Sequence, residues 1–216
     1  GEGMELLIWR EPERVARDTY IARETPEYVI SPSGDGGGLY NLGKPEALRY
    51  MTDYLKAVVD EYRLAWIRFD YNTNPLPFWQ YLNDQDPDRV GMGEIRYVEG
   101  LYQMWDEVLE AHPHLMIDNC AGGGTRIDLE TCSRSIPLWR TDGTIASLHA
   151  VDFDGAALRN QIMTAGLSRY LPFHTSGQMG VTPYQFRSGY NGGISFGEDC
   201  RPDDYPRDVL KKAIAE

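Results

Sequence analysis

Two aspartates lie where strand-like segments of the chain end. Asp70 closes the run Trp66–Asp70 (WIRFD), and Asp142 closes Pro137–Asp142 (PLWRTD). Two carboxylates held on rigid strands and facing one cleft are what glycoside cleavage requires. One attacks the anomeric carbon, and the other protonates the leaving oxygen and then activates water. Strand-end aspartates also cap helices or pair with a neighbouring arginine, so spacing alone leaves both roles open.

A glycine-rich segment, Cys120–Arg126 (CAGGGTR), follows another strand-like run, Leu115–Cys120. Its glycines would let the backbone approach a ligand closely. A phosphate-binding loop is the rival interpretation, but neither the Walker pattern nor G-x-G-x-x-G is present. Cys120 taken by itself is more typical of a small buried residue than of a nucleophile. Histidines and acidic residues show no clear metal-ligand spacing, so we expect chemistry without a metal or cofactor.

The elements that would position these groups alternate between strand and helix. Short apolar runs predict strands at Leu6–Trp9, Trp66–Asp70, Leu115–Cys120, Pro137–Asp142, Leu171–Ser176 and Gly193–Gly197. Helical spacing and composition predict helices at Pro45–Tyr62, Glu94–Ala111, Arg126–Ser135, Gly155–Ser168 and Pro183–Tyr190, with a helical tail from Pro206. The Asn- and Pro-rich stretch after Asp70 is expected to be a loop.

Strand–helix alternation indicates parallel strands joined by right-handed crossovers. Five strand candidates end in a polar or reactive group: Glu11, Asp70, Cys120, Asp142 and His174. Such groups converge at the active-site face of a (β/α) barrel, which has eight strands and about 250 residues when complete. With six strand candidates, we predict a single α/β domain over residues 1–216, a partial TIM-type barrel of about six parallel strands.

Composition narrows the class of protein. The chain has 216 residues, with 21 Lys+Arg against 33 Asp+Glu and a formal charge of −12. This balance argues against a nucleic-acid partner, since a phosphate-binding surface needs Lys and Arg in excess. No apolar run approaches the roughly 20 residues of a membrane span, and the first residues lack the basic start of a secretory signal. The three cysteines are few for a disulfide scaffold, so we expect a reducing, cytoplasmic location.

Several motifs, in conserved order along the chain, resemble those of glycoside hydrolase family 36, the melibiase-type α-galactosidases. Residues 9–13 (WREPE) resemble the family's W-F-E-P-E, and residues 41–46 (NLGKPE) resemble its D-L-S-R-P-E. Residues 68–72 (RFDYN) resemble the nucleophile motif K-W-D-x-N, and residues 139–142 (WRTD) resemble the acid/base motif W-T-S-D. Residues 120–128 (CAGGGTRID) resemble C-S-G-G-G-G-R-x-D, and His174-Thr175-Ser176 fits the family's H-V-S.

The resemblance implies a retaining glycosidase that acts on terminal α-galactosides, with Asp70 as nucleophile and Asp142 as general acid/base. It also implies the residues that contact the sugar: Trp9, Arg68, Asn72, Cys120, Gly123 and Arg140. Arg68 and Arg140 stand where the common family pattern has Lys and Thr. An α-N-acetylgalactosaminidase is an alternative, because a 2-acetamido group requires only local changes near Cys120 and its glycine loop.

The resemblance begins at the third strand of the family barrel. We therefore expect strands 3–8 here, without the first strand's D-D-G-W motif and without the flanking β-domains. A barrel that lacks two strands exposes edges and an apolar interior, which predicts a homo-oligomer in which open barrels cover one another. The alternative from another class is a catalytically incompetent barrel fragment that self-assembles and keeps both carboxylates.

Overall fold

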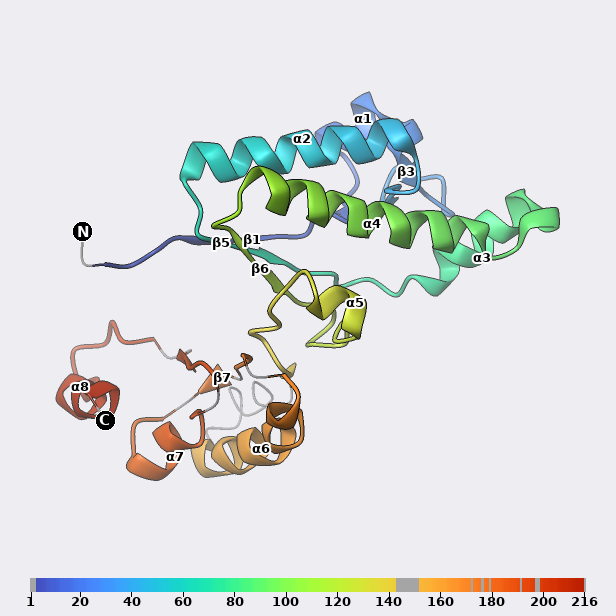
Figure 1. Cartoon of the computed structure of the whole chain (residues 1–216). Helices are drawn as coiled ribbons and strands as arrows, with labels where there is room; N and C mark the ends of the chain where they lie inside the picture. The colour runs from blue at the N-terminus through green and yellow to red at the C-terminus, as the bar shows by residue number, and fades with distance from the viewer. Residues whose placement is uncertain are drawn as a thin grey trace. The chain divides into compact units, whose positions relative to one another are not determined.

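The computed structural model describes residues 3–142, 152–171, 173–175, 177–178, 180–190, 192–196 and 199–215. The chain divides into two compact units, Gly1–Ile117 and Asp118–Glu216. Each unit has helices and strands of its own (Figure 1). Among the described residues, no helix is both long enough and apolar enough to cross a membrane.

Three strands form a sheet in the order β1–β5–β6, and the boundary between the two units falls within β6. These strands are β1 (Leu7–Arg10), β5 (Trp66–Phe69) and β6 (Met116–Asn119), and each lies within one residue of a predicted run. β1 and β5 run parallel, with Trp9 opposite Arg68. Side chains alternate along β5, so that Ile67 and Phe69 are fully buried while Trp66 and Arg68 are partly exposed.

Helices α2 (Pro45–Tyr62) and α4 (Met92–Ala111) lie side by side over one face of this sheet (Figure 1). α2 has the predicted bounds, beginning at a proline, which the first helical position tolerates. Buried residues recur at helical spacing along each helix, as in an amphipathic helix on a core. Phe69 of β5 stacks on Trp105 of α4, with ring centroids 6.0 Å apart and both side chains fully buried. This ring pair joins the sheet to its helices.

The segment predicted as a loop after β5 instead contains α3 (Leu76–Gln85) and a 3₁₀ helix, η2 (Pro87–Arg89). The prolines there fall at the start of α3, where a missing N–H donor breaks no helical hydrogen bond. Trp79 of α3 packs on Tyr97 of α4, with ring centroids 5.0 Å apart. This stretch is therefore helical and packed against α4, although its composition indicates a loop.

A small antiparallel sheet, in the order β2–β4–β3, is also absent from the sequence prediction. Its strands are β2 (Arg14–Val15), β3 (Val29–Ile30) and β4 (Gly38–Tyr40), with α1 (Tyr20–Glu24) and the 3₁₀ helix η1 (Pro26–Tyr28) between β2 and β3. Strands of two or three residues are too short to show alternation in the sequence. The close pairing of β3 with β4 requires a glycine at residue 38, because the Cβ of any other residue would overlap the carbonyl oxygen of Ile30.

The second unit carries helices at or near the predicted positions. They are α5 (Leu129–Cys132), α6 (Phe153–Ala165), the 3₁₀ helix η4 (Leu167–Arg169), α7 (Pro183–Arg187) and α8 (Arg207–Ala215). β7 (Gly177–Gln178) and β8 (Ser195–Phe196) form a parallel pair. β8 lies inside the predicted run Gly193–Gly197, whose last residue is outside the described residues, as are Pro172 and Ser176 of the run Leu171–Ser176.

The strand predicted at Pro137–Asp142 is wrong as a continuous strand. The pairing there consists of isolated bridges, from Asp118 to Ile136 and from Trp139 to Thr175. Pro137 has no N–H to donate, which interrupts a hydrogen-bonded ladder at that point. In the described part of the chain, the expected set of six parallel strands is thus found only in part, as β1–β5–β6 and β7–β8.

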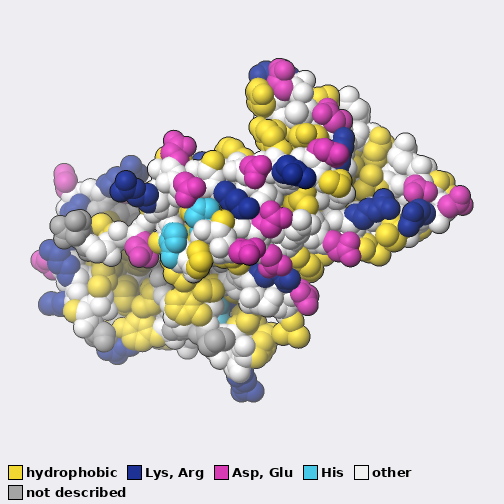
Figure 2. Space-filling model, turned by 45° about the horizontal axis from the view of Figure 1, so that its top comes forward, with side chains coloured by type: hydrophobic (Ala, Val, Ile, Leu, Met, Phe, Trp, Pro, Cys, Tyr) yellow, Lys and Arg dark blue, Asp and Glu magenta, His cyan; other side chains and the backbone are white. Residues whose placement is uncertain are grey.

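The molecular surface carries charges of both signs. On the face drawn in Figure 2, acidic and basic side chains are interspersed among hydrophobic ones. The described side chains drawn there form no continuous basic area of the kind that tracks a phosphate backbone.

His174 is a fully buried polar residue of the second unit. Its Nε2 lies 3.0 Å from Ser168 Oγ, while no described residue hydrogen-bonds its Nδ1. Burial, and after it the nearby Arg140 guanidinium, lower the pKa of His174 below its ordinary 6.5. The fold therefore favours the neutral imidazole.

We predict that Phe69→Ala lowers the free energy of unfolding by about 3–5 kcal/mol, because it leaves a cavity against Trp105. Denaturant unfolding followed by circular dichroism measures this loss. The control is Tyr62→Ala, at a ring that is 46% exposed. It should change the free energy by less than about 0.5 kcal/mol. Equal losses in the two variants would contradict the packing role of Phe69.

The lowered pKa of His174 predicts a loss of stability on acidification. The unfolded chain takes up a proton at this imidazole as the pH falls through about 6.5, whereas the folded chain resists protonation. The contribution is complete above that pH and is lost as the pH falls through the folded pKa, at up to about 1.4 kcal/mol per pH unit. The free energy of unfolding should be measured from about pH 5 to about pH 7.5. Its slope against pH should be shallower in His174→Gln than in the parent. An identical slope in the variant would show that His174 does not contribute to the pH dependence of stability.

Candidate active site

Asp70 follows the last residue of β5 and is only 9% exposed. The indole Nε1 of Trp9 donates to Asp70 Oδ2 at 3.1 Å, and the backbone N–H of Tyr71 donates to Oδ1 at 2.9 Å. N–H donors on both oxygens stabilise the ionised carboxylate, which is the form that a nucleophile needs. Trp9 lies opposite Arg68, two residues before Asp70, so the three side chains share one face of the sheet.

Asn72 and Glu11 extend this group. Asn72 Nδ2 donates to Glu11 Oε1 at 2.8 Å, and Glu11 also forms an ion pair with Arg14. Glu11 directly follows β1, so the ends of two neighbouring strands are linked through side chains. Sequence reasoning includes Asn72 among the site residues but not Glu11, although its position just after a strand is a usable signal.

Asp142 is an exposed carboxylate of the second unit. Trp139 Nε1 donates to Asp142 Oδ1 at 2.6 Å. Trp139 is held by its bridge to Thr175. Each candidate carboxylate therefore accepts a hydrogen bond from an indole in its own unit. Trp139 is absent from the predicted site residues, although the motif of residues 139–142 contains it.

The glycine run forms a loop directly after β6. Gly122–Gly124 all have positive φ, at 49°, 79° and 92°, a conformation that side chains rarely adopt. The carbonyl of Arg126 accepts a hydrogen bond from Asn119 Nδ2 at 2.6 Å, which ties the far end of the loop to the strand. A Cβ built on Gly123 would lie 2.6 Å from Asp142 Cγ. The loop and the carboxylate of Asp142 are thus in direct contact.

Asp128 ends the motif of residues 120–128 and has a structural role. Its side chain accepts from the Thr131 backbone N–H at 3.0 Å and from Thr131 Oγ1 at 2.9 Å, which caps the N-terminus of α5. Burial acts to raise the pKa of Asp128, but the hydrogen bonds from Thr131 and from the backbone N–H groups of Asp128 and Glu130 together lower the pKa. This carboxylate therefore stays ionised and holds α5 after the loop.

Arg140 and Cys120 lie on either side of the glycine loop in the sequence. Arg140 Nη1 lies 3.4 Å from the carbonyl oxygen of Gly124, and burial lowers the pKa of this arginine. Cys120 is 2% exposed. The structure therefore groups the predicted residues by unit: Trp9, Arg68, Asp70 and Asn72 in the first, and Cys120, Gly123, Arg140 and Asp142 in the second.

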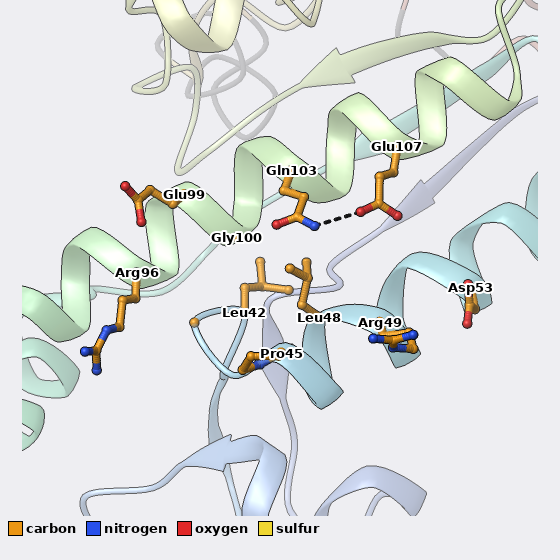
Figure 3. A pocket seen from close by; sticks show the side chains of 11 residues that line it. Leu42, Pro45, Leu48, Arg49, Asp53, Arg96, Glu99, Gly100, Gln103 and Glu107 are labelled. Atoms are coloured by element: carbon orange, nitrogen blue, oxygen red, sulfur yellow. Dashed lines mark hydrogen bonds between the residues drawn. The ribbon is translucent and has the colours of Figure 1, made fainter.

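Two surface hollows lie in the first unit. One, of about 740 Å³, is between α2 and α4, and Figure 3 shows its charged rim and the hydrogen bond from Gln103 to Glu107. None of the predicted site residues lines it. The other, of about 370 Å³, adjoins Glu11 and includes Tyr20, Tyr50 and Tyr54. Among the described residues, no group of three or more His, Cys, Asp or Glu is arranged to hold a metal ion.

The chain is similar to bacterial α-galactosidases. It is 26% identical over 151 residues to alpha-galactosidase 1 of Pediococcus pentosaceus, covering 67% of this chain and 20% of that protein. It is 23% identical over 196 residues to alpha-galactosidase Mel36A of Lactobacillus acidophilus, covering 83% of this chain and 26% of that protein. The chain thus spans between a fifth and about a quarter of the length of these curated relatives.

Solved structures share its fold. The GH36 alpha-galactosidase AgaA from Geobacillus stearothermophilus matches with a TM-score of 0.76 at 19% identity, covering 99% of this chain and 30% of that one. The alpha-galactosidase from Lactobacillus brevis matches with a TM-score of 0.73 at 20% identity and the same two coverages. The Melibiase family model matches residues 1–165, a range that includes both Asp70 and Asp142. The chain therefore belongs to the Melibiase family, glycoside hydrolase family 36.

Proposed function

We propose that this chain carries the catalytic pair of a retaining α-galactosidase that hydrolyses terminal α-galactosides. The observation that carries the proposal is the position of Asp70, which ends a buried parallel strand, is held by two N–H donors and lies in the family match. The substrate class is supported by relatives, because variants of AgaA were crystallised in complex with stachyose and with raffinose. The chain contains both carboxylates, and we assign it to a partial barrel domain.

The proposed reaction has two steps. Asp70 attacks the anomeric carbon while Asp142 gives its proton to the leaving oxygen, and water then releases the sugar while Asp142 accepts a proton. Retention of configuration requires the two carboxyl groups about 5–5.5 Å apart across the glycosidic bond. Neither step uses a metal ion or an organic cofactor.

The sugar-contacting residues are assigned by their place around each carboxylate. Trp9 is 47% exposed, so its ring can border the sugar while its N–H holds Asp70. Arg68 and Asn72 flank Asp70 in the same stretch of chain and supply hydrogen-bond donors for hydroxyl groups. Cys120 and Gly123, which follow β6, are assigned by the family resemblance alone, since Cys120 is 2% exposed.

We also propose that the chain self-associates through β1. β1 is an edge strand of the sheet β1–β5–β6, and its flank exposes Leu6 and Leu7 at 48% and 39%. Exposed apolar edge strands pair readily with another chain. A homo-oligomer that covers this edge follows from that arrangement.

For the chemistry, we predict release of 4-nitrophenol from 4-nitrophenyl α-galactoside, and a fall of at least about 1000-fold in kcat for Asp70→Ala. Asp53→Ala, an exposed carboxylate on α2, is the control and should keep the parental rate. Turnover that survives Asp70→Ala would exclude Asp70 as the nucleophile. Faster turnover of the α-N-acetylgalactosaminide would instead identify the alternative specificity.

For the assembly, light scattering should give the mass of two or more chains of 24.5 kDa each. Leu7→Lys places a charge on the exposed edge and should shift the mass toward the monomer, because charged edges oppose strand pairing. Leu129→Lys, at a residue that is 88% exposed on α5, should leave the mass unchanged. A parental monomer that binds no apolar dye would refute self-association.

A further inference from the structure

Asp142 is held between two groups of the second unit. Its Oδ1 accepts the indole N–H of Trp139 at 2.6 Å. Its other oxygen, Oδ2, faces Gly123, where a Cβ would lie 2.7 Å from Oδ2 and 2.6 Å from Cγ. Heavy atoms do not normally approach a Cβ this closely, so the carboxylate occupies space that only a glycine leaves open.

The loop is held at this distance by its next residue. A Cβ on Gly124 would overlap the carbonyl oxygen of Arg140, so the backbones of the loop and of the segment before Asp142 pack directly on each other. Arg140 Nη1 also reaches the Gly124 carbonyl at 3.4 Å. Gly122 differs, since a Cβ there would meet nothing within 4 Å. The clearance beside Asp142 is therefore a property of Gly123 and not of the whole glycine run.

We propose that Gly123 is a positioning residue that keeps Asp142 Oδ2 clear, while Trp139 holds Oδ1, so that Oδ2 is the oxygen that carries the transferred proton. Among the described residues, the side-chain hydrogen bond to this carboxylate is the one from Trp139 to Oδ1. The inference rests on the proposed glycosidase function and assigns the acid/base step to one atom.

The C1–O bond to the leaving group breaks, its electron pair stays on the leaving oxygen, and that oxygen takes the proton from Oδ2 while Asp70 supplies the pair for the new C1–O bond. In the second step the water oxygen forms a bond to C1, the bonding pair returns to Asp70, and the proton of that water goes to Oδ2. Both proton transfers use the oxygen beside Gly123.

A methyl group at residue 123 would push the carboxylate away from this position. The nucleophile at Asp70 would be unaffected, so the loss should depend on how much the leaving group needs a proton. A sugar alkoxide needs protonation, whereas 4-nitrophenolate leaves without it. The variant should therefore discriminate between melibiose and 4-nitrophenyl α-galactoside.

The experiment compares Gly123→Ala with Gly122→Ala, because both replace a glycine of positive φ and only the first meets Asp142. For Gly123→Ala, kcat/KM for melibiose should fall about 100-fold or more. For the nitrophenyl substrate the fall should be much smaller, and azide should accelerate turnover of the glycosyl-enzyme. Gly122→Ala should change kcat/KM for the two substrates by the same factor. Equal factors for Gly123→Ala as well would overturn the proposal.

A second measurement does not depend on activity. The indole N–H resonance of Trp139, assigned with Trp139→Phe, should shift in Gly123→Ala and stay in place in Gly122→Ala. An unmoved resonance in Gly123→Ala would overturn the positioning role even if the parent were inactive. Inactivity of the parent on both substrates would count against the proposed function alone.

The effect of Gly123→Ala on stability is measured in two backgrounds, the parent chain and Asp142→Ala. Any fall in Tm caused by Gly123→Ala should be smaller when Asp142 is already alanine, because the overlapping carboxyl group is then absent. A fall of the same size in both backgrounds would show that the methyl group disturbs the loop and not Asp142, and would overturn the proposal.

Discussion

The parallel pairing of β1 with β5 determines where Asp70 and its partners stand. Leu7 to Arg10 pair residue for residue with Trp66 to Phe69, which places Trp9 opposite Arg68 and brings its indole to Asp70. A slip of one residue would turn each side chain of β1 to the other face. The register of β5 is fixed by burial of Ile67 and Phe69, and Phe69 stacks on Trp105 of α4. Packing of the hydrophobic core therefore sets the geometry around the carboxylate.

The second unit holds its carboxylate by a different means. Asp142 follows isolated bridges and not a continuous strand, so the hydrogen-bonded ladder does not fix its direction. Its position depends on the indole of Trp139 and on a loop of three glycines with positive φ. Glycine adopts such a backbone at little cost, and at Gly123 the missing side chain also makes room for the carboxylate. Both carboxylates thus accept an indole N–H, although one is held by strand register and the other by loop contacts.

Sequence reasoning predicted the elements whose pattern is long enough to see. α2 has the predicted bounds and β5 differs by one residue, because burial of one face imposes a regular spacing. The antiparallel sheet of β2, β3 and β4 was missed because its strands are too short for alternation, and α3 was missed because its prolines mark a loop by composition. Of the site, Asp70 and Asp142 could be found at the ends of strand-like runs. Glu11 was expected at the active-site end of its strand but was given no role, and Trp139 was not among the predicted site residues. Their contacts cross between strands or lie within a turn, and no local pattern specifies such partners.

Covalent trapping of the glycosyl-enzyme would show whether Asp70 is the nucleophile. The chain would be treated with a fluorinated galactosyl fluoride that forms the glycosyl-enzyme quickly and hydrolyses it slowly, and intact mass and peptide mapping would follow. If Asp70 is the nucleophile, we expect one fluorogalactosyl adduct per chain, located on Asp70 and absent from Asp70→Ala. An adduct on another residue, or a chain that turns over galactosides without forming an adduct, would contradict it.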